Sequence, residues 1–252
     1  MSPNPHPSYS NPTIAEALCE LHFSLPGGRD FQQQWYGDFF NRASAKYPIM
    51  EPQEITEFIA GFGRKGMTQS KQERLRMIYR HGGRSDLIQL SENILAVNVL
   101  PRYAGWSDFK SHIKTAWELF QDTASPDGLS RIGLRYINRI PKRFPTEPAV
   151  SWLRSSEYFP GKILESEEGY HSRFQLPLGP NRRLVVIVAE LEEDGGAHSI
   201  MLDIDTIRDA QVGAAWSEIE ACLEELHDQV WEVFEKSKGP ALDALLREAA
   251  HA

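Results

Sequence analysis

The segment Ser130-Arg-Ile-Gly-Leu-Arg-Tyr-Ile-Asn-Arg-Ile140 lies near the middle of the 252-residue chain and has the period of a β-strand. Successive side chains of a strand point to opposite faces, so Ile132, Leu134 and Tyr136 share one face. The other face carries Arg131, Arg135, Ile137 and Arg139, and Pro141 ends the segment. We expect the first face to meet a core, whereas the guanidinium groups of the second need water, carboxylates or an anionic partner.

The composition predicts a soluble globular protein. Hydrophobic residues make up 41% and charged residues 25% of the chain, and no apolar run approaches the roughly 18 residues of a membrane helix. Residues 1–12 contain four prolines and lack the pattern of a signal peptide. We therefore expect a flexible arm over 1–12, a cytoplasmic location and no contact with a membrane.

Periodicity and turn residues predict the remaining elements. In the first half we expect a strand over 14–25, a helix over 31–46, strands over 53–64, 73–80, 86–90 and 94–100, and a helix from Trp106 to about 125. In the second half we expect a strand over 131–140, a short helix over 149–156, strands over 163–176, 183–192 and 198–207, and a helix over 214–236. A short terminal helix is expected within 241–252.

The two halves repeat one order of elements and share short motifs. Trp106-Ser-Asp-Phe109 opens the late helix of the first half, and Trp216-Ser-Glu-Ile219 opens that of the second. Later in these helices, Ala116-Trp-Glu-Leu-Phe120 corresponds to Val230-Trp-Glu-Val-Phe234. The prediction is an α+β fold of two tandem related β-α-β-β-β-α units, 13–128 and 129–238, with antiparallel sheets packed by long amphipathic helices and a tail over 239–252.

Three passages resemble a sporadically distributed family of prokaryotic proteins of unknown function that has a Gly-Leu-Arg-Tyr-Ile-Asn core motif. They are Asn11-Pro-Thr-Ile-Ala-Glu-Ala-Leu-Cys-Glu20, Leu87-Ile-Gln-Leu-Ser-Glu-Asn-Ile-Leu-Ala-Val-Asn-Val-Leu100 and Gly133-Leu-Arg-Tyr-Ile-Asn138. The resemblance implies no catalytic residues. The patchy distribution of the family is like that of genes in mobile or phage-defence systems.

The candidate binding residues lie on the central segment and on one later strand. We expect Arg135, Tyr136, Asn138 and Arg139 to form a face for a ligand or a partner. Asp203 and Asp205 alternate with Leu202 and Ile204, so both carboxylates share a face. Those two acids could bind a metal, act in acid–base chemistry or face solvent, but we favour ion pairs with Arg135 and Arg139, supported by Glu190 on the neighbouring strand.

The sequence contains no motif for a cofactor or a metal. It lacks a Walker A loop, a Gly-x-Gly-x-x-Gly loop, a Gly-x-Ser-x-Gly elbow and a His-Glu-x-x-His helix. The histidines are scattered without the spacing of metal ligands, and Cys19 and Cys222 are expected to be buried and reduced. We therefore expect no catalytic residues, no metal and no cofactor, which leaves enzymatic activity open but favours its absence.

Three functions remain at this point. The first is a non-enzymatic binding or scaffold protein that meets a protein partner or a second copy of itself. The second is a sensor of a small anionic ligand, such as a nucleotide, that contacts the arginines. The third is an RNA-binding protein, which the net charge of −8 disfavours because phosphate backbones attract cationic surfaces.

Overall fold

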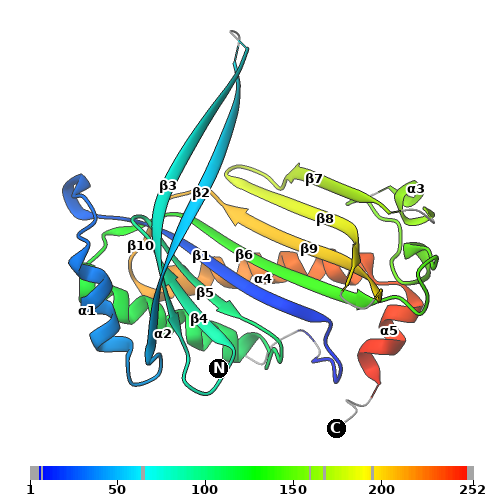
Figure 1. The fold of residues 1–252 in the computed structure, drawn as a ribbon, viewed down its shortest axis with the longest axis horizontal. Helices are drawn as coiled ribbons and strands as arrows, with labels where there is room; N and C mark the ends of the chain where they lie inside the picture. The colour runs from blue at the N-terminus through cyan, green and yellow to red at the C-terminus, as the bar shows by residue number, and fades with distance from the viewer. Residues whose placement is uncertain are drawn as a thin grey trace.

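The computed structural model describes residues 6, 8–63, 66–158, 160–166, 169–193 and 196–248, with the backbone alone over 55–63 and 66–73. Within these residues the chain forms ten strands and five α-helices (Figure 1). The strands are β1 Ile14–Ser24, β2 Ile49–Gly63, β3 Gly66–Arg80, β4 Asp86–Leu90, β5 Ile94–Val99, β6 Gly128–Pro141, β7 His171–Pro177, β8 Arg182–Glu192, β9 His198–Arg208 and β10 Val212–Gly213. The helices are α1 Gln34–Ala43, α2 Trp106–Ala124, α3 Gly161–Leu164, α4 Trp216–Ser237 and α5 Pro240–Arg247.

The described strands belong to one antiparallel sheet, in the order β2-β3-β4-β5-β1-β6-β9-β8-β7, with β10 paired to β6. The expectation of an antiparallel α+β fold is confirmed. The expectation of a sheet for each unit is corrected, because β1 and β6 pair along most of their length and join the two sets of strands. Each half places its first strand at the centre and its later strands outward.

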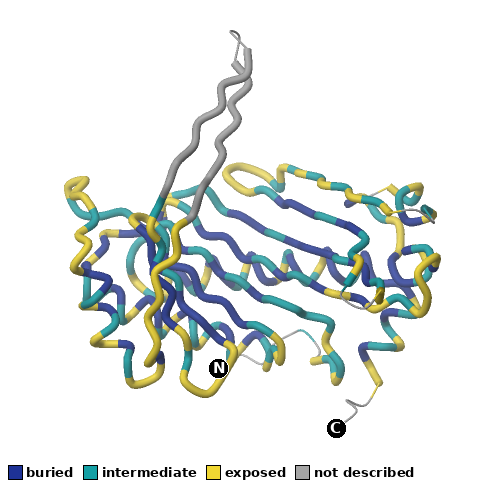
Figure 2. The backbone as a smooth tube through the Cα atoms, viewed as in Figure 1, coloured by how far each residue is buried: buried dark blue, intermediate teal, exposed yellow. Residues whose placement is uncertain are grey.

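Two long helices cover one face of this sheet. α4 packs on β6 and β9, α2 packs on β5, and α1 packs beside α2. The apolar stripe predicted for the first late helix is buried as expected: Trp106, Phe109, Ile113, Trp117 and Phe120. In Figure 2 buried residues run along the strands at the middle of the sheet, and exposed residues gather in the loops at its rim. One hydrophobic core therefore includes residues of both halves.

Two elements of the second half differ from the prediction. Of the helix expected over 149–156, only a 3-10 turn forms, at Ala149–Ser151. The strand expected from residue 163 begins at His171. Residues 161–164 instead form α3, where Pro160 has the extended conformation common before a helix and Gly161 opens the turn. Leu164 is therefore buried as part of a helical turn, and not as part of the strand expected there.

The tail forms α5 and docks on the end of α4. Leu242 and Leu246 are buried, and Gly239 passes so close to Trp152 that an added Cβ would lie 2.6 Å from the Trp152 carbonyl oxygen. The Gly-Pro pair at 239–240 thus has two roles, since glycine permits the close approach and proline begins the helix. Residues 249–252 of the expected terminal helix lie outside the described residues.

β2 and β3 form a long hairpin at one end of the sheet. Their backbones pair from Ile49↔Arg80 to Gly63↔Gly66, whereas β3 pairs with β4 only over Met77–Arg80 in the described residues. Figure 1 shows the two arms extending beyond the rest of the sheet.

Candidate functional site: the two faces of β6

The alternation of β6 separates its side chains into two environments. Ile132, Leu134, Tyr136 and Asn138 point to the face covered by α4 and are buried. Arg131, Arg135, Ile137 and Arg139 point to the opposite face, on which no helix packs in the described part of the chain. We call the latter the open face. The four candidate residues of the segment therefore do not form one face: Arg135 and Arg139 lie on one side of the sheet, and Tyr136 and Asn138 lie on the other.

On the open face, Arg135 forms the predicted ion pair with Asp203. Arg135 Nε donates to Asp203 Oδ1 at 2.8 Å, and Arg135 Nη2 donates to Asp203 Oδ2 at 2.5 Å. The Asp203 side chain is only 2% exposed, whereas that of Arg135 is 36% exposed. The hydrogen bond to Asp203 and the charges of Asp203, Asp205 and Glu16 raise the pKa of Arg135. The pair is bidentate, so Asp203 occupies two donors of this guanidinium group.

The other expected members of the ionic lattice have different partners. Arg139 lies 3.7 Å from Glu193 and is 54% exposed. Glu190 lies 2.5 Å from the ammonium group of Lys142 and 3.2 Å from His198, so it does not pair with an arginine in the described residues. Asp203 stands opposite Ile137, so Arg135 and Arg139 are each two positions away from it in the register, and both of its carboxylate oxygens accept from Arg135.

Asp205 lies beside this pair but has no ion-pair partner within 4 Å among the described residues. Burial raises the pKa of its carboxyl to about 6, and the positive charge of Arg135 opposes that shift. Glu20 and Asp203 raise the pKa further by repulsion. At neutral pH this carboxylate is a partly buried and incompletely compensated charge.

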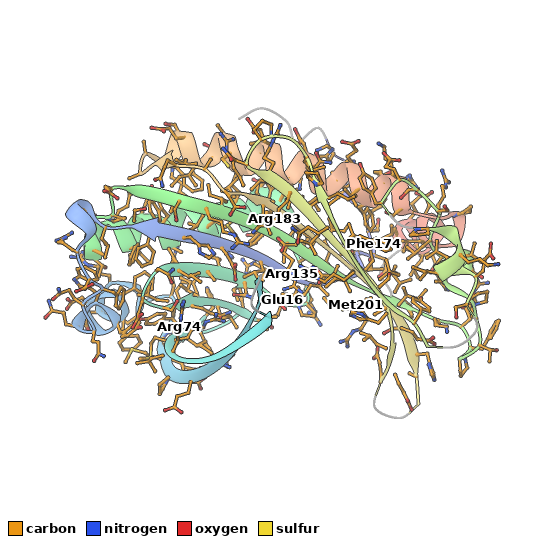
Figure 3. The ribbon with its side chains drawn as sticks, turned by 90° about the horizontal axis from the view of Figure 1, so that it is seen from above. Glu16, Arg74, Arg135, Phe174, Arg183 and Met201 are labelled. Carbon is orange, nitrogen blue, oxygen red and sulfur yellow. The ribbon has the colours of Figure 1, made fainter. Side chains whose placement is uncertain are left out.

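Polar side chains continue from Arg135 across the open face. Arg76 donates to Gln89 at 2.7 Å, and Gln89 donates to Asn98 at 2.7 Å. Asn98 then donates to Glu16, which lies near Arg135 in Figure 3. A row of hydrogen bonds and charges therefore crosses β3, β4, β5, β1, β6 and β9.

On the covered face, β6 borders an apolar hollow that we call the aromatic cavity. It lies between β6, α4 and the N-terminal arm and has a volume of about 80 Å³. Its lining consists of Tyr9, Pro12, Thr13, Ile14, Tyr103, Tyr136, Asn138, Ile204, His227, Val230, Trp231, Phe234 and Leu246. A second hollow of about 130 Å³ shares part of this lining and extends toward Trp106 and His6.

Several polar side chains lie in the wall of the aromatic cavity. The hydroxyl oxygens of Tyr103 and Tyr136 are 2.9 Å apart, so one hydroxyl donates to the other. Asn138 accepts from the Thr13 hydroxyl at 3.0 Å and donates to the Leu202 carbonyl at 3.3 Å. Burial raises the pKa of both tyrosines, which are therefore neutral donors and acceptors. One hydroxyl proton forms the hydrogen bond between the two tyrosines, so the proton of the other hydroxyl can be donated to a ligand.

Among the described residues that line the aromatic cavity, His227 on α4 has a buried ring nitrogen without a hydrogen-bond partner. Its ring stacks on Trp106 at 4.2 Å between centroids, with planes 6° apart. The side chain is buried, and Nδ1 has no hydrogen-bond partner in the described residues. Burial lowers the pKa of His227 to about 3, so the imidazole is neutral at physiological pH.

The N-terminal arm contacts α4 and α5 and forms one side of the cavity. Tyr9 donates to Glu235 at 2.5 Å and accepts from Lys238 at 2.6 Å. The backbone amide of Asn11 donates to the Leu246 carbonyl at 3.1 Å. The His6 ring stacks on Trp231 with 4.7 Å between ring centroids. The expected flexibility of the arm stays a prediction, but its described residues have defined contacts.

The sequence thus identified Tyr136 and Asn138, but it did not connect them with Tyr103, His227 or the arm. The sequence feature that could have identified Tyr103 is its position between the Pro101-Arg102 turn and the helix that begins at Trp106. The feature that could have identified His227 is that it is a polar residue on the buried side of an amphipathic helix. No helix in the described residues is both long enough and apolar enough to span a membrane. Comparison of the chain with protein-family models and with curated proteins finds no match.

Proposed function

We propose that the chain is a binding protein that holds a small, uncharged, planar ligand in the aromatic cavity. The observation that carries this proposal is the coincidence of an apolar, aromatic lining with a few polar groups that lack full partners. Such a combination is typical of ligand sites, because apolar walls provide affinity and a few polar atoms fix orientation. Tyr103, Tyr136 and His227 supply those atoms here.

The charge of the lining favours a neutral ligand over the anionic ligand expected from the sequence. The described lining contains no lysine, arginine, aspartate or glutamate. Burying a carboxylate or phosphate without a cation is strongly unfavourable. Arg135, the residue expected to meet an anion, lies on the other face of the sheet, and Asp203 already holds its guanidinium group.

The aromatic cavity alone is smaller than a benzene site, and a ring system would occupy it together with the adjoining hollow. An apolar cavity of about 150 Å³ accommodates benzene in a protein core. The two adjoining hollows have volumes of about 80 and 130 Å³. Contact with the aromatic lining and hydrogen bonding to the tyrosine hydroxyls would favour a heteroaromatic ring that carries both a donor and an acceptor.

Calorimetric titration with indole and indole-3-carboxylate at pH 7.5 tests this function. These probes share a ring system and differ in charge, so they separate a neutral from an anionic site. We expect indole to bind at least tenfold more tightly, a difference of about 1.4 kcal/mol. Val230→Trp, which fills the cavity from α4, should abolish binding; Ile14→Trp does the same from the edge of the cavity if the first variant does not fold.

Arg139→Ala is the matched control, because Arg139 lies on the same strand but on the open face. Its affinity for indole should stay within about twofold of the parent protein. Tighter binding of the carboxylate, or equal loss of indole binding in Arg139→Ala and Val230→Trp, would contradict the proposed site. No saturable binding of either probe up to their solubility limits would also contradict it.

A protein partner on the open face is the second candidate, and the row from Arg76 to Asp203 favours it. This row carries charges of both signs on a face without a helix, and such a surface can be complementary to a second copy about a twofold axis. Sedimentation velocity between 1 and 100 μM tests it. We expect association that Arg131→Glu weakens; a monomer over the whole range would rule out a second copy as the occupant.

We also propose that the two halves are diverged copies of one β-α-β-β-β-α unit. The outward order of strands on either side of β1 and β6 supports this, and so does the start of α2 and α4 at Trp106 and Trp216. Superposition of residues 13–128 on 129–238 should align these tryptophans. If they fall on non-equivalent positions, the repeated motifs are independent solutions to packing a helix on a sheet.

A further inference from the structure

At the outer end of the aromatic cavity, three side chains from opposite ends of the chain converge. His6 Nε2 lies 2.8 Å from Asp228 Oδ1, across a sequence separation of 222 residues. One ligand atom each from His6, His227 and Asp228 lies within 4.8 Å of the other two. Each of these three groups is a common ligand of transition metals.

Both imidazole rings are held in place by flat stacking. His227 stacks on Trp106 with planes 6° apart, and His6 stacks on Trp231 with planes 21° apart. The rings also approach each other, with centroids 5.3 Å apart. Ligands whose rotamers are fixed before binding lose little entropy when a metal arrives.

The hydrogen bonding of His227 is a second observation, independent of the spacing of the three side chains, that points to a ligand here. It is 6% exposed, and its Nδ1 has no hydrogen-bond partner in the described residues. A buried polar atom without a partner is unfavourable by about 1–3 kcal/mol. Native proteins tolerate such atoms chiefly where they have another role.

We propose that His6, His227 and Asp228 bind a divalent transition-metal ion, with Zn²⁺ as the best match. Two imidazoles and one carboxylate form a common set for Zn²⁺, which leaves a fourth position for water or a ligand. In tetrahedral geometry the ligand atoms are about 3.3 Å apart, so the present separations need to shrink by at most about 1.5 Å. This site goes beyond the proposed function, because it fastens the arm to α4 whether or not the cavity is filled.

The geometry gives the metal a defined structural effect. His6 belongs to the arm, whereas His227 and Asp228 belong to α4. Metal binding would therefore hold the arm over the cavity, where Tyr9 and Pro12 form part of the wall. The open coordination position would face the hollow between His6 and Trp106.

The test uses the whole chain and the metals alone. We expect the parent protein to bind one Zn²⁺ per chain in calorimetric titration and to give the intense visible absorption of tetrahedral Co²⁺. His6→Gln and Asp228→Asn should each weaken Zn²⁺ binding at least about tenfold, given that even loss of a group that hydrogen-bonds to a metal ligand weakens binding by 10–100-fold. Both residues lie near the surface, so their replacement tests the site without loss of the fold; His227→Gln is the third variant.

His112→Gln is the matched control. His112 also lies near two carboxylates, 3.2 Å from Asp86 and 4.0 Å from Asp108, but Arg84 occupies both acids. This variant should bind Zn²⁺ within about twofold of the parent protein. Absence of Zn²⁺ binding by the parent, or equal affinities of the parent, His6→Gln and Asp228→Asn, would overturn the proposal. Indole binding by a metal-free protein separates this result from that of the cavity test.

Discussion

The two faces of β6 use the same alternating segment in opposite ways. On the open face, Arg135 is paired with Asp203, and Asn98 is hydrogen-bonded to Glu16. On the covered face, Tyr136 borders a cavity in which the hydroxyl pair and His227 retain unused hydrogen-bonding capacity. Arg135 is thus paired within the sheet, whereas Tyr136 and His227 line the cavity that we propose as a binding site. This comparison leads to four predictions.

The largest effect is expected from Arg135→Ala. Removal of the guanidinium group leaves Asp203, which is 2% exposed, as a buried charge without its partner. Breaking a buried ion pair in this way costs about 3–5 kcal/mol, and the partial exposure of Arg135 places the expected loss near 3 kcal/mol. Urea unfolding monitored by tryptophan fluorescence measures it.

Arg139→Ala is the control for that measurement. Its side chain is 54% exposed and lies 3.7 Å from Glu193, so the loss should be under about 1 kcal/mol. If Arg135→Ala unfolds at the same urea concentration as Arg139→Ala, the open face does not stabilise the sheet and the assignment of the two faces is wrong.

The second prediction concerns pH. The pKa of Asp205 is raised to about 6 in the folded protein from an ordinary value of 3.8, so the folded state binds a proton more tightly than the unfolded state does. Stability from this group is therefore present below about pH 4 and is lost as the pH rises to about 6. At about 1.4 kcal/mol per pKa unit, Asp205→Asn should stabilise the protein by roughly 1–3 kcal/mol at pH 7.5.

The same substitution should have little effect on stability at pH 4, where the carboxyl is protonated. Urea unfolding of the parent and of Asp205→Asn at both pH values makes the comparison. A stabilisation that is equal at pH 4 and pH 7.5 would exclude titration of Asp205 as its cause.

The third prediction addresses the covered face. Tyr136→Phe and Tyr103→Phe each remove one hydroxyl of a pair 2.9 Å apart, so each should cost about 1 kcal/mol. The double variant should cost less than the sum, because the second hydroxyl has already lost its partner. A double-mutant cycle from urea unfolding gives the coupling; additive losses would show that the hydroxyls do not interact.

The smallest effect concerns the arm. The backbone amide of Asn11 donates to the Leu246 carbonyl, but residues 1–12 contain four prolines. We expect this amide to exchange through local opening, well before the amides of β1, and to gain protection when Zn²⁺ is added. Hydrogen exchange followed by mass spectrometry tests it; protection of the arm equal to that of β1 without metal would contradict its predicted flexibility.

Part of this arrangement could be predicted from the sequence. The alternation from Ile132 to Arg139 gave the correct faces, since period two directly reflects the geometry of a strand. The pairing of Arg135 with Asp203 was predicted because the guanidinium groups on this face of the strand need neutralising carboxylates, and Asp203 carries one on the face of another strand. The partners of Arg139 and Glu190 were not, because they depend on register, and a shift of two residues exchanges one cross-strand neighbour for another.

The aromatic cavity could not be predicted from local patterns. Its wall combines the arm, the loop before α2, three strands and two helices, and none of these segments is unusual alone. His6 and Asp228 are 222 residues apart, so spacing rules for metal ligands do not apply to them. Tertiary packing creates both features. The helix-forming turn at 161–164 was missed for a different reason, namely that short apolar runs have no distinctive period.

The seam between β1 and β6 has a consequence for synthesis of the protein. Thr13 and Asn138, which hydrogen-bond across this seam, are 125 residues apart in the sequence. At 5–20 residues per second a ribosome needs roughly 6–25 s to make the intervening chain. Once β5 has been made, β1 has β5 as its neighbour on one side and an unpaired edge on the other until β6 follows. The nascent first half therefore presents an aggregation-prone strand edge that only translation of the second half can cover.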